Sequence, residues 1–342
     1  MKKPRISEIS GKIKALILLA VIILGIIAAD IFINIHKTEK TYVAMGTVVT
    51  TKIQGRNADE AEEEIRLMIS GTETACLSWR VEGSDIYRIN EGSGKFVSVS
   101  KDTSKWISDC YEICDKSKGA FDITVGKVTQ LWDFDGESQI VPDKKAIEKA
   151  LEDVDYSQLL FNNTGVKAQK GQFLDMGAVG KGIACDSARN ILDSCGIKSA
   201  TVSVGGSVLV YGKAATVGII NPDDDKKTIG TLKFKDKCVS TSGDYERFFE
   251  KDGKKYHHII DPSTGYPTEN NLRSVTVLCD SGLRSDALST ACFVLGYEGA
   301  LGLLKQCGAE AVFVFKDKTV AVSDGMKKTF KLTDSSYKMK ES

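Results

Sequence analysis

The longest apolar run of the chain lies near the amino terminus. Between residues 15 and 33 only Asp30 is charged, and about 20 apolar residues are enough to cross a bilayer as a helix. Five basic side chains and one acidic side chain precede the run, which predicts an amino terminus in the cytoplasm and a remainder outside it. We therefore predict a cytoplasmic basic tail over residues 1–14, a transmembrane anchor over 15–35 and a linker over 36–41.

A cleaved signal peptide is the competing interpretation of this run. Its apolar core would exceed the usual length of about 7–15 residues, and no clear small-x-small cleavage site follows it. A lipid-modified cysteine is excluded because the first cysteine is Cys76. The uncleaved anchor is favoured, so we expect a single-pass protein of the cell membrane whose main domain lies outside the cytoplasm.

From residue 42 onward, helical and strand-like periodicities are mixed. Apolar side chains alternate from 42 to 53, as they do in a strand. Asn57 is a suitable cap for a helix that ends at Gly71. Further helices are predicted over 103–116, after Asp143 and over 181–195, and strands at 200–204, 207–211, 215–220 and 229–234, with a hairpin near 311–322.

Strands segregated from helices predict an α+β fold and argue against a doubly wound parallel sheet. No Gly/Ser-rich linker, repeat or low-complexity tract interrupts the pattern. We therefore predict one large domain over residues 42–335, followed by a tail over 336–342.

Charge and cysteine usage narrow the class of partner. The chain has 46 basic and 46 acidic residues, but the first 40 residues hold seven basic and three acidic ones, so the rest carries a net charge of −4. A mildly acidic domain argues against a nucleic-acid partner. The nine cysteines form no tight metal-ligand cluster and most have apolar neighbours, so we expect buried free thiols.

The stretch from 239 to 267 concentrates hydroxyls, carboxylates and glycines in turns. A turn is predicted at 241–244, a hairpin turn at 252–253 and a further turn at 261–265. Between them lie His257 and His258, two of the three histidines in the chain. Because side chains alternate along a strand, the two imidazoles must face opposite sides. A histidine that merely bonds a nearby carbonyl is the ordinary alternative for either one, and the polar turns favour a functional site.

Two glycine-rich segments also carry carboxylates. Residues 119–126 contain Asp122 between two glycines, which allow close approach of the backbone to a ligand. Residues 175–182 place Asp175, Lys181 and three glycines at the entrance to a helix, an arrangement that presents N–H groups to an anion. The second segment is not a Walker A loop, because Gly182 stands where Ser or Thr is needed. A flexible loop-to-helix turn remains the alternative.

A carboxylate and a hydroxyl share one face of the helix predicted to begin near residue 285 and to end at Gly296. Asp286 and Thr290 are four residues apart, hence one turn apart, and their oxygens suit a hard cation. The alternative makes Asp286 a helix cap and Thr290 a surface residue.

The combination of motifs is more specific than any one of them. Six motifs occur in this order: Met-Gly-Thr (45–47), Gly-Ala-Phe-Asp-Ile-Thr-Val-Gly (119–126), Leu-Asp-Met-Gly-Ala-Val-Gly-Lys-Gly (174–182), Thr-Ser-Gly-Asp-Tyr (241–245), His-Ile-Ile-Asp-Pro-Ser-Thr-Gly (258–265) and Ser-Asp-Ala-Leu-Ser-Thr (285–290). Together they resemble the ApbE family, the FAD:protein FMN transferases, over residues 42–330. The chain departs from the family where an apolar helix replaces the amino-terminal lipobox of many members, and in the spacing near residues 77–84.

The resemblance implies a single ApbE-like domain, related to the T-fold, and a Mg²⁺-dependent enzyme. Such an enzyme binds FAD and moves its FMN half onto a Thr or Ser hydroxyl of a partner protein, releasing AMP. By motif match, the metal ligands would be the Ala178 carbonyl, Asp286 and Thr290. The FAD site would be formed by Met45, Ala120, Phe121, Asp122, Asp175, Lys181 and His258. His258 and Asp286 would be the catalytic residues, with His257 packed on the other side.

Two alternatives share these residues. An FAD pyrophosphatase would use water in place of the acceptor hydroxyl, and a surface flavin-binding protein would do no chemistry. The resemblance further implies an exported or membrane acceptor, either a redox subunit or a flavoprotein of extracellular electron transfer.

Overall fold

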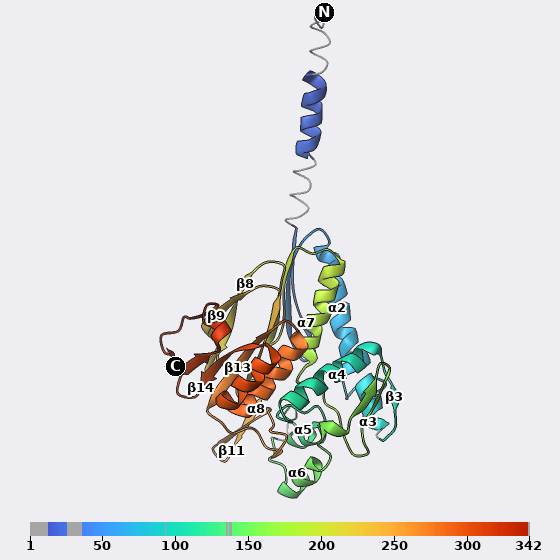
Figure 1. The fold of residues 1–342 in the computed structure, drawn as a ribbon, viewed down its shortest axis with the longest axis vertical. Coiled ribbons are helices and arrows are strands. Elements are labelled where there is room, and N and C mark those ends of the chain that lie inside the picture. Colours follow the sequence, from blue (N-terminus) through green and yellow to red (C-terminus); the bar gives the residue numbers. More distant parts are fainter. Residues whose placement is uncertain (1–12, 26–35, 93, 135, 137–138, 341–342) are drawn as a thin grey trace, which may run out of the picture.

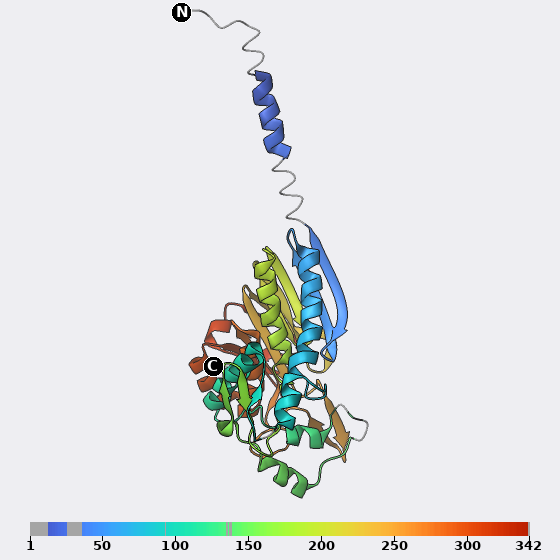
Figure 2. The ribbon, with the colours of Figure 1, turned by 90° about the vertical axis from the view of Figure 1, so that its right-hand side faces the viewer.

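The computed structural model describes residues 13–25, 36–92, 94–134, 136 and 139–340. From residue 36 onward the chain is built in layers (Figure 1). A large central sheet has helices on one face and a smaller sheet on the other. Figure 2 shows the helices lying along the sheet.

The central sheet has the strand order β1-β2-β6-β7-β10-β13-β14-β15-β17, and its neighbours are antiparallel except for β15 and β17. A predominantly antiparallel sheet confirms the α+β prediction. Its strands are β1 (Lys37–Ala44), β2 (Thr47–Gln54), β6 (Ser199–Val204), β7 (Ser207–Tyr211), β10 (Lys237–Gly243), β13 (Leu272–Cys279), β14 (Glu310–Phe315), β15 (Thr319–Val322) and β17 (Lys338–Met339).

The smaller sheet consists of β8 (Ala215–Asn221), β9 (Asp224–Phe234) and β16 (Phe330–Leu332). Its apolar side chains pack against those of the central sheet in one buried cluster, with Leu232 and Val239 among the members. Two further small sheets are formed by β3 (Val97–Ser98), β4 (Leu160–Asn162) and β5 (Gly165–Lys167), and by the hairpin of β11 (Phe248–Lys251) and β12 (Lys254–His257).

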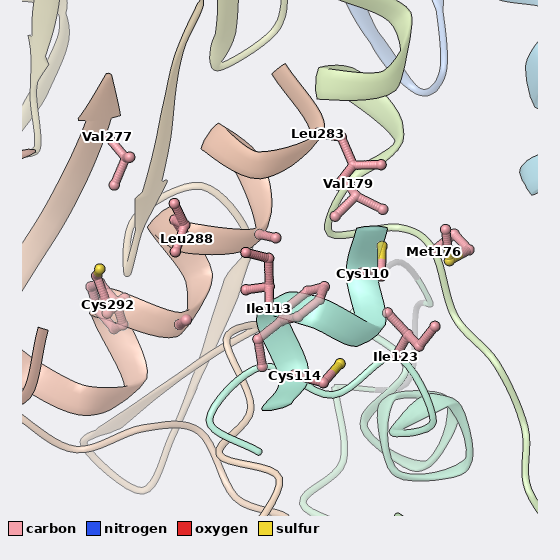
Figure 3. Close-up of a cluster of buried hydrophobic side chains, with 14 of the residues drawn as sticks. Cys110, Ile113, Cys114, Ile123, Met176, Val179, Val277, Leu283, Leu288 and Cys292 are labelled. Carbon is pink, nitrogen blue, oxygen red and sulfur yellow. The ribbon is translucent and has the colours of Figure 1, made fainter. Parts of the chain in front are cut away.

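Three helices cover the other face of the central sheet, namely α2 (Ala58–Thr72), α7 (Gly180–Ser194) and α8 (Gly282–Cys307), and α4 (Lys101–Lys116) packs against α8. Figure 3 shows this contact, where Cys110, Ile113 and Cys114 of α4 lie in one buried cluster with Leu288 and Cys292 of α8. The remaining helical elements are α3 (Asp85–Glu91), α5 (Gly126–Trp132), α6 (Lys144–Leu151), a π-helical turn (Glu73–Leu77) and two 3-10 turns (Tyr156–Gln158 and Asp324–Met326).

The prediction of one strand over 42–53 is wrong, because these residues form the hairpin of β1 and β2. Met45 and Gly46 form its turn, with φ of 51° and 65°. Two left-handed residues in succession are typical of the tight turn whose twist matches that of antiparallel strands. The alternation through the turn does not mark one buried face, because Val43 pairs with Val48 and is 77% exposed, whereas Val49 pairs with Tyr42 and is buried.

Two predicted boundaries differ from the structure, and a third is confirmed. β1 starts at Lys37, inside the predicted linker, because it pairs with β2 along its whole length. The predicted tail contains β17, which pairs with β15, and the buried ring of Tyr337 precedes it. The predicted end at Gly296 is confirmed: with φ of 70° and ψ of 177° this residue is non-helical and divides α8 into two helical segments, the second of which runs to Cys307 before the left-handed Gly308.

The amino-terminal prediction lies partly outside the described residues. A short apolar helix is present at Ile13–Gly25, whereas residues 26–35 fall in the part of the chain that is not described. Within the described residues, α8 is the helix long and apolar enough to cross a membrane, but half of its most apolar window is buried in the fold. We therefore assign α8 to the core.

All nine cysteines have free thiols, and six of them are buried, as the sequence predicts. Burial raises the pKa of the Cys110, Cys114, Cys185, Cys238 and Cys292 thiols. These side chains therefore behave as small apolar groups of the core.

Candidate active site at the first turn of helix α7

The amino-terminal ends of α7 and α8 meet and cap each other. The Asp286 carboxylate, from α8, accepts hydrogen bonds of 2.6 Å from the Gly182 N–H of α7 and of 2.6 Å from the Ser207 hydroxyl. In the opposite direction, Asp186 of α7 accepts from the N–H groups of Gly282 and Leu283 at the start of α8, at 2.7 and 3.0 Å. Each carboxylate thus lies at the positive end of the partner helix.

Glycine is required at this crossing. A Cβ on Gly182 would overlap the Gly282 carbonyl, and a Cβ on Gly282 would overlap the Gly182 carbonyl. The glycine of the Gly-Lys-Gly sequence therefore serves helix packing. It also brings Asp286 next to Gly182, the residue that follows Lys181, although Asp286 and Lys181 are 105 residues apart in the sequence.

Lys181 is the cation around which the polar groups gather. Its ammonium lies 4.0 Å from the Glu246 carboxylate, and both side chains are about one quarter exposed. Burial raises the pKa of Asp286, and the charge of Lys181 opposes that rise. Burial likewise raises the pKa of Glu246, which Lys181 also opposes. The sequence interpretation missed Glu246, although it directly follows the quoted Thr-Ser-Gly-Asp-Tyr motif.

His258 belongs to the same group. Its backbone N–H donates to the Arg247 carbonyl at 3.0 Å, while its Nδ1 atom is buried and has no hydrogen-bond partner within the described residues. Burial, followed by the nearby charges of Arg247 and Lys181, lowers the pKa of His258 to about 3. The imidazole is therefore neutral at pH 7, with one ring nitrogen available to a ligand.

His257 faces away from this group, as strand alternation predicts. Its Nδ1 accepts from the Ile259 N–H at 3.3 Å, so its Nε2 is the donor to the Thr268 carbonyl at 2.9 Å. The ring packs edge-on against Phe293, with 5.5 Å between centroids. Both nitrogens are thus occupied, which defines a structural histidine.

Thr290 lies one turn after Asp286 in a cluster of hydroxyls. Its Oγ1 lies 3.3 Å from the Ser242 hydroxyl, which is also 2.8 Å from that of Ser289. Within the described residues, no three His, Cys, Asp or Glu side chains are grouped as metal ligands. A cation held here would rely on a single carboxylate together with hydroxyl and carbonyl oxygens.

The loop before α7 is joined to the loop at 119–126. Asp175 accepts from the Gly177 N–H at 2.8 Å and from the Thr129 hydroxyl at 3.0 Å, and its own N–H donates to the Ile123 carbonyl at 2.8 Å. Ala178, which follows in the turn, is exposed. The two glycine-rich segments of the sequence therefore form one continuous wall beside α7.

The side chains of residues 120–122 differ in how far they are buried or hydrogen-bonded within the protein. Phe121 is 3% exposed within the hydrophobic core. The Asp122 carboxylate accepts from the N–H and hydroxyl of Thr124, both at 2.7 Å, and from the Tyr156 N–H at 3.1 Å. Hence Phe121 and Asp122 hold the loop in place, and Ala120 with the local backbone is the part that is more open to a ligand.

Met45 lies at the tip of the β1–β2 hairpin. Its N–H donates to the Glu73 carboxylate at 3.0 Å, and its side chain contacts both of the main hydrophobic clusters. The predicted site residues are thus contributed by the hairpin tip, the two linked loops, the crossing of α7 with α8 and, for His258, the segment that follows β12.

These features define an α+β protein in which a helix amino terminus, a lysine and carboxylate and hydroxyl oxygens lie close together. The ApbE family model matches residues 45–313. The FAD:protein FMN transferase of Treponema pallidum is 31% identical, over 89% of this chain and 91% of its own. The Escherichia coli K12 protein of that name is 30% identical, over 82% of this chain and 86% of its own.

Solved structures agree with this relationship. The crystal structure of the ApbE protein of Thermotoga maritima has a TM-score of 0.79 at 33% identity, and the match covers 86% of this chain and 99% of that one. The apo form of the flavinyl transferase ApbE of Pseudomonas stutzeri has a TM-score of 0.77 at 27% identity, covering 86% and 96%. The chain belongs to the ApbE family.

Proposed function

We propose that the protein transfers the FMN half of FAD onto a Thr or Ser hydroxyl of an exported or membrane acceptor protein. The acceptor oxygen forms a bond to the FMN phosphorus, and the bond from that phosphorus to the bridging oxygen breaks. AMP leaves with the bridging oxygen, and the hydroxyl proton passes to His258 Nδ1. The observation that carries the proposal is the buried, unpartnered Nδ1 atom of His258 in the group around Lys181.

The charges near α7 suit a pyrophosphate. The two phosphates of FAD carry about two negative charges, and a helix amino terminus favours anions. Lys181 supplies one positive charge, but Asp286 and Glu246 are close to it. Arg247 adds a second positive charge near Glu246 and His258. Two cations beside two carboxylates and a pyrophosphate still leave an excess of negative charge, so a metal cation is needed.

Magnesium fits the oxygen atoms available. It takes one or two carboxylates together with substrate phosphates and water in octahedral geometry, which agrees with a site that has a single carboxylate. The Asp286 carboxylate, the Thr290 hydroxyl and the Ala178 carbonyl would hold it. Bound there, Mg²⁺ would neutralise charge on the phosphates.

His258 is suited to accept the proton once a substrate is bound. Its low pKa in the free protein keeps the imidazole neutral at pH 7, so one of its two ring nitrogens is an acceptor. A bound pyrophosphate would oppose the charges of Arg247 and Lys181, and would thereby raise the pKa of the imidazole toward the range of an effective general base. His257, with both nitrogens bonded, has no such role.

Product analysis tests the proposal. The full-length protein is incubated with FAD, Mg²⁺ and a purified acceptor, and the acceptor mass, free FMN and AMP are measured. Transfer gives an acceptor heavier by FMN less water, with one AMP per adduct. Free FMN and AMP without an adduct would show a pyrophosphatase instead, and unchanged FAD would show a binding protein.

The location of the reaction is part of the proposal. The basic residues before the apolar amino-terminal segment support a catalytic domain outside the cytoplasm. The short apolar helix at Ile13–Gly25 agrees with a single-pass membrane anchor.

A further inference from the structure

A cavity of about 590 Å³ lies beside the proposed active site. Its walls come from the end of β8, the turn into β9 and the start of β9, and from Tyr245, β11, β12 and the start of β13. The contributing residues are Asn221, Pro222, Asp223, Asp224, Asp225, Lys226, Tyr245, Phe248, Lys255 and Arg273.

The cavity is close in the chain to groups assigned to catalysis. Tyr245 and Phe248 line it, and Glu246 and Arg247 stand between them in the sequence. Of these, Glu246 lies 4.0 Å from Lys181, and the Arg247 carbonyl accepts the backbone N–H of His258 at 3.0 Å. A molecule in the cavity would therefore lie close to the groups that we propose to bind the pyrophosphate.

The walls carry charges of both signs, three carboxylates (Asp223, Asp224, Asp225) and three cations (Lys226, Lys255, Arg273). The Arg273 guanidinium is already bonded to Asp244, to Asp223 and to the Pro222 carbonyl, at 2.9, 2.9 and 3.0 Å. The loop adds Asp224 and Asp225, so that three successive carboxylates stand at the opening. The Arg273 guanidinium is thus already engaged, and the cavity offers carboxylates together with the ammonium groups of Lys226 and Lys255 to a ligand.

The apolar part of the walls is accessible. Phe248 is 44% exposed, and the Lys255 ammonium lies 3.9 Å from the centre of its ring. An aromatic ring together with Pro222 offers a surface for an apolar side chain, while the acidic loop offers carboxylates to basic or amide groups. This mixture suits a polypeptide.

An edge strand leads into the cavity. β8 is the outer strand of the smaller sheet, and its last residue, Asn221, lines the cavity. The preceding Ile220 is 41% exposed. An edge strand can pair with an extended polypeptide, whose alternate side chains then enter adjoining pockets.

We propose that this cavity, with the β8 edge, binds the segment of the acceptor protein that flanks the modified hydroxyl, and that an apolar side chain of that segment packs against Phe248. The proposal rests on the transfer function proposed above. It explains how a hydroxyl carried by a protein, in preference to water, is delivered to the phosphate.

The test uses a purified acceptor. Proteins carrying covalent flavin are identified by their fluorescence in denaturing gels of the host, and one of them is then prepared without flavin from cells that lack the transferase. Transfer rates are measured against acceptor concentration for the full-length protein and for Phe248→Ala, Ile220→Ser and Phe96→Ala. Phe96 is the matched control, an aromatic ring that is 55% exposed and does not line the cavity.

Phe248→Ala should raise KM for the acceptor about tenfold, and Ile220→Ser should raise it in the same direction, with kcat and the affinity for FAD unchanged. Phe96→Ala should match the unmodified protein. An unchanged KM in Ile220→Ser and in folded Phe248→Ala, or an equal rise in Phe96→Ala, would overturn the docking proposal. If Phe248→Ala does not fold, Ile220→Ser decides alone. Absence of transfer by the unmodified protein would instead refute the proposed function.

Discussion

Asp286→Asn separates a metal ligand from a helix cap, because Asp186 provides a matched control. Each carboxylate accepts N–H groups at the start of the partner helix. The side-chain amide of Asn keeps one oxygen that can accept a hydrogen bond. Its NH₂ group replaces the other carboxylate oxygen and faces a group that itself donates. Each substitution therefore removes a charge-assisted hydrogen bond worth about 1.5–3 kcal/mol, and we expect similar losses in the free energy of unfolding.

The two substitutions should differ in their dependence on magnesium. Asp286 would contribute the single carboxylate of the metal site, whereas Asp186 bonds Ser281, Gly282 and Leu283 at the start of α8. Asp286→Asn should require at least about tenfold more Mg²⁺ for half-maximal transfer, equivalent to about 1.4 kcal/mol. Asp186→Asn should leave the Mg²⁺ requirement unchanged.

Transfer is measured against Mg²⁺ concentration at saturating FAD, and stability is measured by denaturant unfolding of the same preparations. Superimposable Mg²⁺ curves for the two variants, with equal losses of stability, would refute the metal assignment. Asp286 would then be a cap and the cation would be held elsewhere.

His258→Ala should slow transfer by about 10²- to 10⁴-fold, while fluorescence titration still shows FAD binding. His257→Ala should mainly lower the denaturation midpoint. An unchanged transfer rate in His258→Ala would show that His258 is not the proton acceptor. The pKa of His258 is about 6.5 in the unfolded chain and about 3 in the folded protein, so the neutral imidazole contributes to the free energy of unfolding above pH 6.5, and this contribution is lost as the pH falls toward 3. The free energy of unfolding of His258→Asn should therefore depend less on pH between these values. Identical pH dependence in the two proteins would contradict this. Glu246→Gln should bind FAD more tightly in fluorescence titrations, since it removes a carboxylate 4.0 Å from Lys181, and weaker binding would count against a pyrophosphate beside Lys181. Protease added to intact cells should degrade the catalytic domain, and full protection would refute the topology.

Local signals were enough for most of the helices and strands. The helix predicted from Asn57 to Gly71 is observed at Ala58–Thr72, since an acidic first turn and an apolar face are local properties. The predicted Asp252-Gly253 turn joins β11 to β12 with left-handed φ at both residues. The Met45-Gly46 turn was not predicted, because methionine rarely adopts a left-handed conformation.

The site was less accessible to sequence reasoning where it depends on contacts between distant segments. Motif spacing places Asp286 and Thr290 on one face of a helix, but the bond from the Gly182 N–H to Asp286 joins residues 104 apart. Glu246 has an unremarkable local context, and only the fold brings it to Lys181. Asp122 was expected at the ligand, and the fold shows its carboxylate bonded to Thr124 and Tyr156.

Transfer in water enriched in heavy oxygen tests the central claim most directly. The full-length protein is incubated with FAD, Mg²⁺ and the acceptor in this water, and the masses of the acceptor and of AMP are measured. If the acceptor hydroxyl attacks the FMN phosphorus and AMP leaves with the bridging oxygen, neither the acceptor adduct nor AMP gains heavy oxygen. Heavy oxygen in AMP, or in free FMN formed without an adduct, would show attack by water and would contradict the account.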